Sequence, residues 1–324
     1  MFSRKQIKTK SLKQRFSKTK IKETAISIDN NYHCANKDIS KISKIIIKAR
    51  KNNRPVILVF GAHLIKNGLS LVLRQLIKEG FITHLATNGA GIIHDWEFAF
   101  LGKSEEDVRD AVSKGEFGIW EETGKYINTA INHGAKRGIG LGQSVGEMIA
   151  NDKFTKHRFK KYSVLDMAYK ENIPFTVHPG FGYDIIHTHP LCNGSAIGKS
   201  ADIDFLKFVD SVSRLNGGVY LSVGSAIMSP MIFEKSLSMS RNVAKQKGED
   251  VDDFAIVVND IQAGGSWKWG TGKEPKKTDP AYYLRFCKTF DRMGSREMYY
   301  VQADNRDFLC SLYKELKDNE SKIH

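Results

Sequence analysis

In Pro55-Val-Ile-Leu-Val-Phe-Gly61, an uninterrupted run of apolar side chains ends at a glycine. A short apolar run without polar alternation is typical of a parallel strand that is buried on both faces. The following residues repeat Leu, Ile and Val at helical spacing over 64–78, stop at Gly80, and lead into a second apolar run at 82–87. This order of strand, helix and strand with short connections predicts a βαβ unit.

The same alternation extends over the rest of the chain. Further strands are expected at 174–178, 219–223, 254–259 and 298–302, and further helices at 39–53, 202–215, 231–241 and 304–317. Helical patterns at 105–113, 122–133, 143–149 and 164–171 predict a helical insertion around 104–171. The sequence therefore predicts an α/β fold, a doubly wound, Rossmann-like parallel sheet with helices on both faces, as a single domain over 23–324.

The composition is that of a folded protein, because 41% of the 324 residues are hydrophobic and 27% are charged. No apolar run approaches the ~20 residues that a membrane-spanning helix needs, so we expect no membrane segment. The four cysteines lie far apart in the sequence and form no C-x-x-C pair. This spacing argues against a zinc ribbon or a disulfide scaffold and favours reduced thiols in the cytoplasm.

The net charge of +14 is concentrated at the N-terminus, where residues 1–22 carry nine Lys or Arg and no acid. Removing these nine charges from +14 leaves only +5 for the remaining residues. Such a basic arm could dock on nucleic acid, an anionic membrane surface or an acidic partner, could be a targeting peptide, or could be a solvated terminus. Elsewhere the sequence has no basic patch interleaved with aromatic residues, so nucleic-acid binding is not expected except through the arm.

Glycine-rich loops follow four of the expected strands, at 61–68, 87–97, 224–230 and 259–266. Carboxyl ends of parallel strands meet at one edge of a sheet, where small residues let a ligand approach the backbone. The pattern favours a nucleotide site, and the alternative is that the glycines only close tight turns. The Gly138-Ile-Gly-Leu-Gly142 stretch follows a helix rather than a strand, so it lacks the context of a dinucleotide fingerprint.

Two groups of titratable residues are candidates for chemistry. His94 and Asp95 lie beside the second loop, where a histidine next to carboxylates can carry protons, although Asp95 could instead cap a helix. Asp184, His187 and His189 form the other group. In an extended segment His187 and His189 would share a face and could bind a metal with Asp184, although such histidines can also form hydrogen bonds only.

Several segments, in this order, resemble deoxyhypusine synthases. Ala62-His-Leu-Ile-Lys-Asn-Gly-Leu69 is similar to the family's S-N-L-x-S-S-G-L, and Thr87-Asn-Gly-Ala-Gly-Ile-Ile-His-Asp95 to its T-x-A-G-G-x-x-E-D. Cys192-Asn-Gly-Ser-Ala-Ile-Gly198 is similar to D-G-S-x-G-D with one residue inserted, and Gly218-Val-Tyr-Leu-Ser-Val-Gly224 to the strand that leads into the family's G-G-G loop. The similarity covers roughly residues 50–270.

The resemblance implies a Rossmann-like fold that binds NAD, a homotetramer whose N-terminal arm reaches a neighbour, and an acceptor protein. By position, NAD would be held by Ala62, His63, Thr87, Asn88, Gly89, Gly91, Asn193, Gly224 and Asp260. The family takes a hydride from spermidine, forms an imine on a lysine and passes the aminobutyl group to a protein lysine.

The catalytic positions of the family are altered. Lys199 stands near its second acid, where a cation would repel spermidine, and this favours a different, anionic substrate as a hypothesis. Residues 226–230 contain no counterpart of the family's histidine pair, and Lys268 lies between tryptophans in altered spacing.

The sequence therefore predicts an NAD-binding enzyme that takes a hydride from an amine or a related small substrate. His94, Asp95 or His187 would move the proton, and Lys199 or Lys268 would bind or attack the oxidised product. One alternative is a metal-dependent hydrolase or lyase that uses Asp184, His187 and His189. The other is a non-catalytic binding protein that docks through its basic arm.

Overall fold

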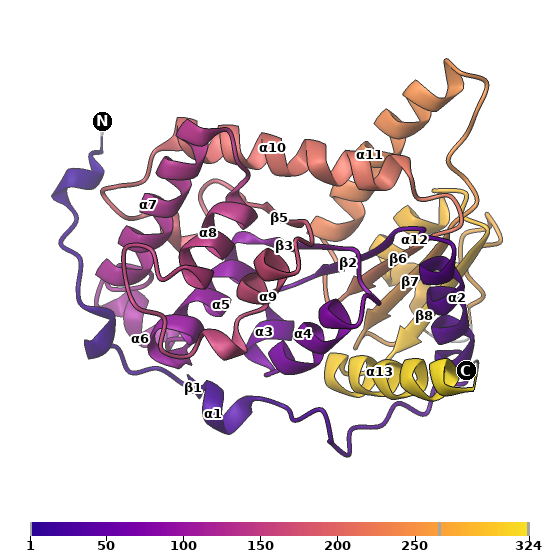
Figure 1. Ribbon diagram of the computed structural model, residues 1–324, viewed down its shortest axis with the longest axis horizontal. Helices are drawn as coiled ribbons and strands as arrows, with labels where there is room; N and C mark the ends of the chain where they lie inside the picture. The colour runs from indigo at the N-terminus through magenta and orange to yellow at the C-terminus, as the bar shows by residue number, and fades with distance from the viewer. Residues whose placement is uncertain (1, 265–266, 323–324) are drawn as a thin grey trace. The chain divides into compact units, whose positions relative to one another are not determined.

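The computed structural model describes residues 2–264 and 267–322, which form two compact units. The first unit holds residues 2–26, 65–74 and 87–205, and the second holds 27–64, 75–86 and the described residues from 206 onward (Figure 1). None of the described helices combines the length and the hydropathy that crossing a membrane requires. The prediction of a single domain over 23–324 stays a prediction.

The predicted α/β fold is confirmed. Six strands form a parallel sheet flanked by helices, in the order β5-β3-β2-β6-β7-β8. The strands are β2 (Val56–Phe60), β3 (His84–Asn88), β5 (Phe175–His178), β6 (Val219–Val223), β7 (Ala255–Asp260) and β8 (Glu297–Gln302). The strand order reverses between β2 and β6, since the chain continues from β2 to β3 on one side and from β6 to β7 on the other. This reversal makes the sheet doubly wound.

Each face of the second unit's strands is covered by its own helices. On one face α2 (Ile39–Lys51) and α13 (Asn305–Ser321) contact β2, β6 and β7. Alternate strand residues such as Ile57, Tyr220 and Ile256 pack into a separate core with α11 (Met228–Lys245), α12 (Arg285–Asp291) and the end of α10 (Gly194–Ser213). Successive side chains of a strand point to opposite faces, so strands that are apolar throughout require this two-sided cover.

The first unit is built around α5 (Gly89–Leu101), which is buried on nearly every side. Around it pack α7 (Glu121–Arg137), α8 (Leu141–Ala150), α9 (Val164–Lys170), the 3-10 helix Lys160–Tyr162 and β5. The helix α6 (Val108–Ser113) and the 3-10 helix Ile185–His187 complete the unit. Helices α6 to α9 lie within the segment 104–171, where the sequence predicted a helical insertion.

The prediction of one continuous helix over 64–78 is wrong, because the structure has two helices there, α3 (His63–Lys66) and α4 (Ser70–Lys78). Gly68 separates them with a left-handed φ of +82°, and a side chain there would meet the Thr24 carbonyl oxygen at 2.0 Å. Of residues 87–97, expected as a loop, the first two end β3 and residues 89–97 form the start of α5. Helix α12 was also missed, and α10 and α11 are longer than predicted.

The basic N-terminal segment lies on the first unit. Its short elements are Arg4–Gln6, Leu12–Gln14, β1 (Thr19–Lys20) and α1 (Ile21–Thr24), and β1 pairs antiparallel with β4 (Lys103–Ser104). Leu12 and Ile21 are fully buried. Lys10, Arg15, Lys18 and Lys20 each pair with a carboxylate, so much of the segment's charge is compensated within the unit.

Candidate functional site

The first unit contains a cavity of about 220 Å³ next to α5. Apolar side chains such as Ile93 and Phe117 form much of its wall. The titratable residues that line it are Arg15, Lys66, His94, Glu97, Glu105, Glu106, Tyr183 and Asp184. A small cavity with several converging titratable groups is the usual form of a ligand site.

A buried ion pair closes one side of the cavity. Arg15 holds the Glu97 carboxylate with two parallel hydrogen bonds of 2.9 and 2.7 Å, and both side chains are at most 3% exposed. Burial raises the pKa of the Glu97 carboxyl, but Arg15 and the other donors outweigh burial, so the pKa is lowered overall. Thr123 Oγ1 also donates to Glu97, at 2.7 Å. Glu97 is therefore a charged acceptor that is fixed in place.

The hydrogen bonds of Ser104 determine the tautomer of His94. Ser104 Oγ donates its single proton to Glu97 Oε2 at 2.6 Å. The 2.7 Å contact between Ser104 Oγ and His94 Nδ1 therefore requires that Nδ1–H donate to the hydroxyl. Burial lowers the pKa of His94 to about 4, against the opposing effect of Glu97, so the ring is neutral at pH 7. Its Nε2, which bonds to no described residue, is left as an acceptor for a ligand.

Asp184 is the carboxylate of the cavity that has no side-chain donor among the described residues. Arg15 holds Glu97, Lys66 lies 2.9 Å from Glu105, and Trp120 Nε1 donates to Glu106. Asp184 is 4% exposed and accepts only the backbone N–H of Gly180, at 2.8 Å. Burial raises its pKa to about 6, since that one hydrogen bond offsets only part of the desolvation. Its charged form is thus poorly compensated until a cation enters.

Asp184 also explains why α5 begins with glycine. A Cβ atom at Gly89 would lie 2.3 to 2.6 Å from the three atoms of the Asp184 carboxyl group. The carboxylate therefore lies against the first turn of α5, where Asn88 caps the helix by accepting from Gly91 N at 3.0 Å. A helix N-terminus favours negative charge, which partly compensates the carboxylate.

We expect Asp184→Asn to stabilise the protein at pH 8. The folded pKa, about 6, lies above the ordinary value of 3.8, so stability is greatest below pH 4 and falls as the pH rises through 6. A shift of this size corresponds to about 1–3 kcal/mol at pH 8, and asparagine keeps the acceptor for Gly180 N–H. Urea unfolding of the wild type and the variant at pH 4 and pH 8 measures this difference in the free energy of unfolding. Glu105→Gln, which breaks the ion pair with Lys66, should instead lose stability at pH 8, and equal behaviour of the two variants would contradict the assignment.

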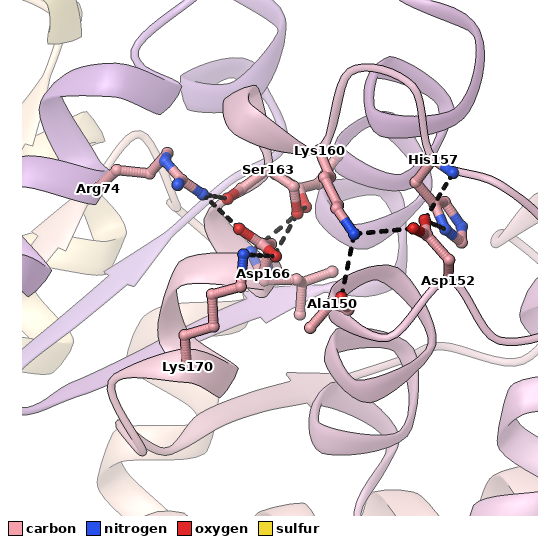
Figure 2. Close-up of polar contacts among 10 residues, drawn as sticks. Arg74, Ala150, Asp152, His157, Lys160, Ser163, Asp166 and Lys170 are labelled. Atoms are coloured by element: carbon pink, nitrogen blue, oxygen red, sulfur yellow. Dashed lines mark hydrogen bonds and ion pairs between the residues drawn. The ribbon is translucent and has the colours of Figure 1, made fainter.

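The structure gives Asp95 a structural position rather than one in the cavity. It is 1% exposed and accepts from Ser163 Oγ at 2.5 Å and from the N–H groups of Val164 and Leu165, so it caps the first turn of α9. Figure 2 shows neighbouring contacts, in which Arg74 lies 3.0 Å from Asp166 and Lys160 donates to Asp152 at 2.8 Å. The capping alternative thus accounts for the contacts of Asp95. Burial raises its pKa to about 6, and its predicted role as a proton carrier stays a prediction.

The metal alternative depended on an extended segment at 184–189, and that expectation is wrong. Residues 185–187 form a 3-10 helix, so His187 and His189 do not share a face. His187 stacks on Phe181, and His189 Nε2 lies 3.2 Å from Glu121. Within the described residues no group of three or more His, Cys, Asp or Glu is arranged to hold a metal ion.

The other predicted residues of the first unit lie outside the cavity. Lys199 is exposed on α10, so it does not set the charge of this cavity. Asn193 is exposed and accepts from Ser195 N and Ala196 N at the start of α10. Thr87 is buried at the end of β3, where its side chain fills the space beside Gly91. Their predicted roles stay predictions.

In the second unit, the predicted residues meet at the carboxyl ends of β2, β6 and β7. Phe60 is in register with Val223, and Val223 with Asn259, so Gly61, Gly224 and Asp260 follow at one edge. Ala62 and the exposed His63 continue from Gly61. Lys268, by contrast, is exposed in a segment without regular structure, which leaves its predicted role untested.

This edge fits a dinucleotide in three respects. It lies where the strand order reverses, which is the usual ligand position in doubly wound sheets. Gly224 has a left-handed φ of +57°, and its backbone is partly exposed. Asp260 Oδ1 accepts from Gln262 N at 3.0 Å, and no described residue donates to Oδ2, which remains for a ribose hydroxyl. Gly61, however, is required by packing alone, because a Cβ there would lie 2.3 Å from the Gly224 carbonyl oxygen.

Solved structures share this architecture. A LOR/SDH protein from Methanococcus maripaludis S2 matches 92% of this chain and 73% of its own, at 16% identity and a TM-score of 0.54. The complex of AgrE with ornithine and NAD+ matches 89% of this chain but 34% of the AgrE chain, at 18% identity and a TM-score of 0.52. The chain has their fold. No family model and no curated protein matches.

A deoxyhypusine synthase from Entamoeba histolytica also aligns, over 86% of each chain, at 12% identity and a TM-score of 0.46. At these identities the similarity shows the fold and assigns no activity.

Sequence reasoning did not assign several residues to this cavity. Arg15 was counted only with the basic arm, Glu105 only as the start of a predicted helix, and Asp184 only as a metal ligand of the alternative function. These residues are far apart in the sequence and come together only in the folded unit. No local sequence pattern therefore indicates that they line one cavity. A cation near an apolar residue within the arm, as in Gln14-Arg15-Phe16, is too common to single out Arg15.

Proposed function

We propose that this chain is an NAD-binding enzyme whose first-unit cavity takes a small substrate with an ammonium group. Asp184 carries the proposal, since it is a buried carboxylate that lines a cavity and has no cationic partner among the described residues. Burying a charge is costly unless it is paired, and an ammonium group supplies the missing partner. His94 Nε2 offers a second acceptor for the same group.

The remaining cations of the cavity do not oppose an amine. Arg15 and Lys66 are neutralised by Glu97 and Glu105 at 2.7 and 2.9 Å. Lys199, whose charge favoured an anionic substrate, does not line the cavity. The similar AgrE structure, of which this chain matches 34%, contains ornithine, which is an amine.

The proposal that the chain binds NAD rests on the carboxyl-end edge of the sheet, where Gly224 and Asp260 lie. NAD+, when bound, would accept a hydride from the substrate carbon that carries the nitrogen, after the ammonium group has passed one proton to Asp184 so that the nitrogen lone pair can form the C=N bond. The role of the chain is to hold the adenosine ribose with Asp260 and to leave backbone open at Gly224. The AgrE complex also contains NAD+, which supports NAD as the cofactor to test.

A crossed binding experiment tests both components. Calorimetric titration of the full chain with NAD+ and with ornithine or spermidine should show binding of NAD+ and of at least one amine. Asp260→Asn should weaken NAD+ by about tenfold to a hundredfold, since a hydrogen bond to a charged group is lost, and should leave the amine unchanged. Asp184→Asn should weaken binding of the amine and leave the affinity for NAD+ unchanged.

Asp252→Asn is the matched control, because Asp252 is exposed in the same unit before β7 begins. It should change neither affinity. Failure of both NAD+ and NADP+ to bind would remove the redox function, and tighter binding of glutarate than of any amine would overturn the substrate class.

A further inference from the structure

The second unit contains a groove of about 470 Å³ between α2 and α13, none of whose lining residues belongs to the cavity or to the NAD edge. Four lysines line it, Lys44, Lys48, Lys51 and Lys322, together with Ile47 and Asn319. On α2 the three lysines are spaced by four and three residues, which places them on one side of the helix. The groove is therefore a largely apolar hollow lined by four exposed lysines.

None of these four lysines has a carboxylate partner among the described residues, although other cations of the same helices do. Lys41 pairs with Asp38, and Arg50 with Glu320. Lys317 pairs with Glu79 and Glu320. The helices thus compensate their other charges and leave those of the groove uncompensated.

This arrangement costs stability. Like charges four or three residues apart destabilise a helix by a few tenths of a kcal/mol per pair. The negative end of the helix dipole favours Lys48 and Lys51 in the last turn of α2, but Lys44 lies outside that turn. Proteins give up stability mainly at functional sites, so this lysine-lined face of α2 is a candidate binding surface.

We propose that the α2–α13 groove binds a small anion with several phosphate groups, such as a polyphosphate or the polyphosphate part of a nucleotide. Closely spaced ammonium groups match closely spaced phosphate oxygens, and Lys binds phosphate as a point charge. Asn319 Nδ2 already donates to Ser43 Oγ at 2.6 Å, so the lysines supply the recognition. This site is independent of the NAD edge and of the cavity.

Calorimetric titration of the full chain with tripolyphosphate and with ATP tests the proposal. Both should bind at low salt and weaken as salt rises. The triple variant Lys44→Gln, Lys48→Gln, Lys51→Gln should bind tripolyphosphate about tenfold more weakly or worse. Because like-charge repulsion is removed, its Tm should equal or exceed that of the wild type, which shows that the fold is intact.

The matched control removes the same charge from the N-terminal segment, with Lys5→Gln, Lys8→Gln and Lys13→Gln, three exposed lysines without a carboxylate partner among the described residues. It should retain the affinity for tripolyphosphate within about twofold. Equal losses in the two triple variants, or no binding at low salt, would overturn the site. A single-stranded RNA that binds the groove more tightly than tripolyphosphate would also overturn the small-anion assignment.

Discussion

Replacing Arg15 with alanine should lower the free energy of unfolding of the first unit by about 3–5 kcal/mol, because it leaves the buried Glu97 carboxylate without its cation. Glu97 is 1% exposed, and two of its hydrogen bonds come from Arg15. Ser104 and Thr123 would remain as donors, but neither carries a charge. Losing one partner of such a pair costs far more than losing a surface ion pair.

Urea unfolding followed by tryptophan fluorescence measures this effect, since Trp96 and Trp120 both lie in the first unit. Lys18→Ala is the matched control, as it removes the same charge from the same segment. The Lys18–Asp107 pair has a 3.0 Å separation, and its side chains are 43% and 47% exposed. Its loss should cost less than about 1 kcal/mol. Equal losses in the two variants would mean that Arg15 is not buried as described.

The Arg15 result also bears on what the N-terminal segment does. If this segment were a separate docking arm, its removal or mutation would leave the rest of the first unit unchanged. Instead Leu12 and Ile21 are buried, Lys10 forms a backbone bridge with Trp120, and Arg15 completes the cavity wall. The segment is thus a structural part of the first unit. Its lysines without a carboxylate partner among the described residues are Lys5, Lys8, Lys13 and Lys22.

The sheet was predictable because its strands carry their own signal. The runs at 55–60, 219–223 and 254–259 are apolar except at Ser222 and Asn259, which is typical of a strand covered on both faces, and the structure places them as β2, β6 and β7. Helix α5 carried no such signal. It is apolar on nearly all sides and opens with Gly89 and Gly91, so neither helical periodicity nor helix propensity distinguishes it from a loop.

The candidate site was predictable only in part. His94 was found because a histidine beside carboxylates is unusual, but which of its neighbours acts on it is decided by tertiary contacts. The adjacent Asp95 points to α9, whereas Glu97, one helical turn from His94, is linked to it through Ser104. On a helix, residues three apart such as His94 and Glu97 share a face, whereas adjacent residues such as His94 and Asp95 do not. Because residues 87–97 were assigned to a loop, the sequence analysis could not use this rule.

Replacing Gly89 with alanine should destabilise the first unit by about 1–3 kcal/mol, although Gly→Ala at a helical position ordinarily stabilises by about 0.4–1 kcal/mol. The added methyl would lie 2.3 Å from Asp184 Oδ2, and Asp184 can yield only by breaking its hydrogen bond with Gly180 N–H. The carboxylate would also leave the position in which it faces the cavity, so amine binding should weaken with it.

A double-mutant cycle separates this contact from any general effect on α5. In an Asp184→Ala background the carboxylate is gone, so Gly89→Ala should become neutral or stabilising, and the sign of its effect on unfolding in urea should reverse. Gly198→Ala is a suitable control, since a Cβ at Gly198 of α10 would meet no atom within 4 Å, and it should stabilise in both backgrounds. If Gly89→Ala destabilises equally with and without Asp184, the carboxylate does not lie against the first turn of α5, and its place in the cavity must be abandoned.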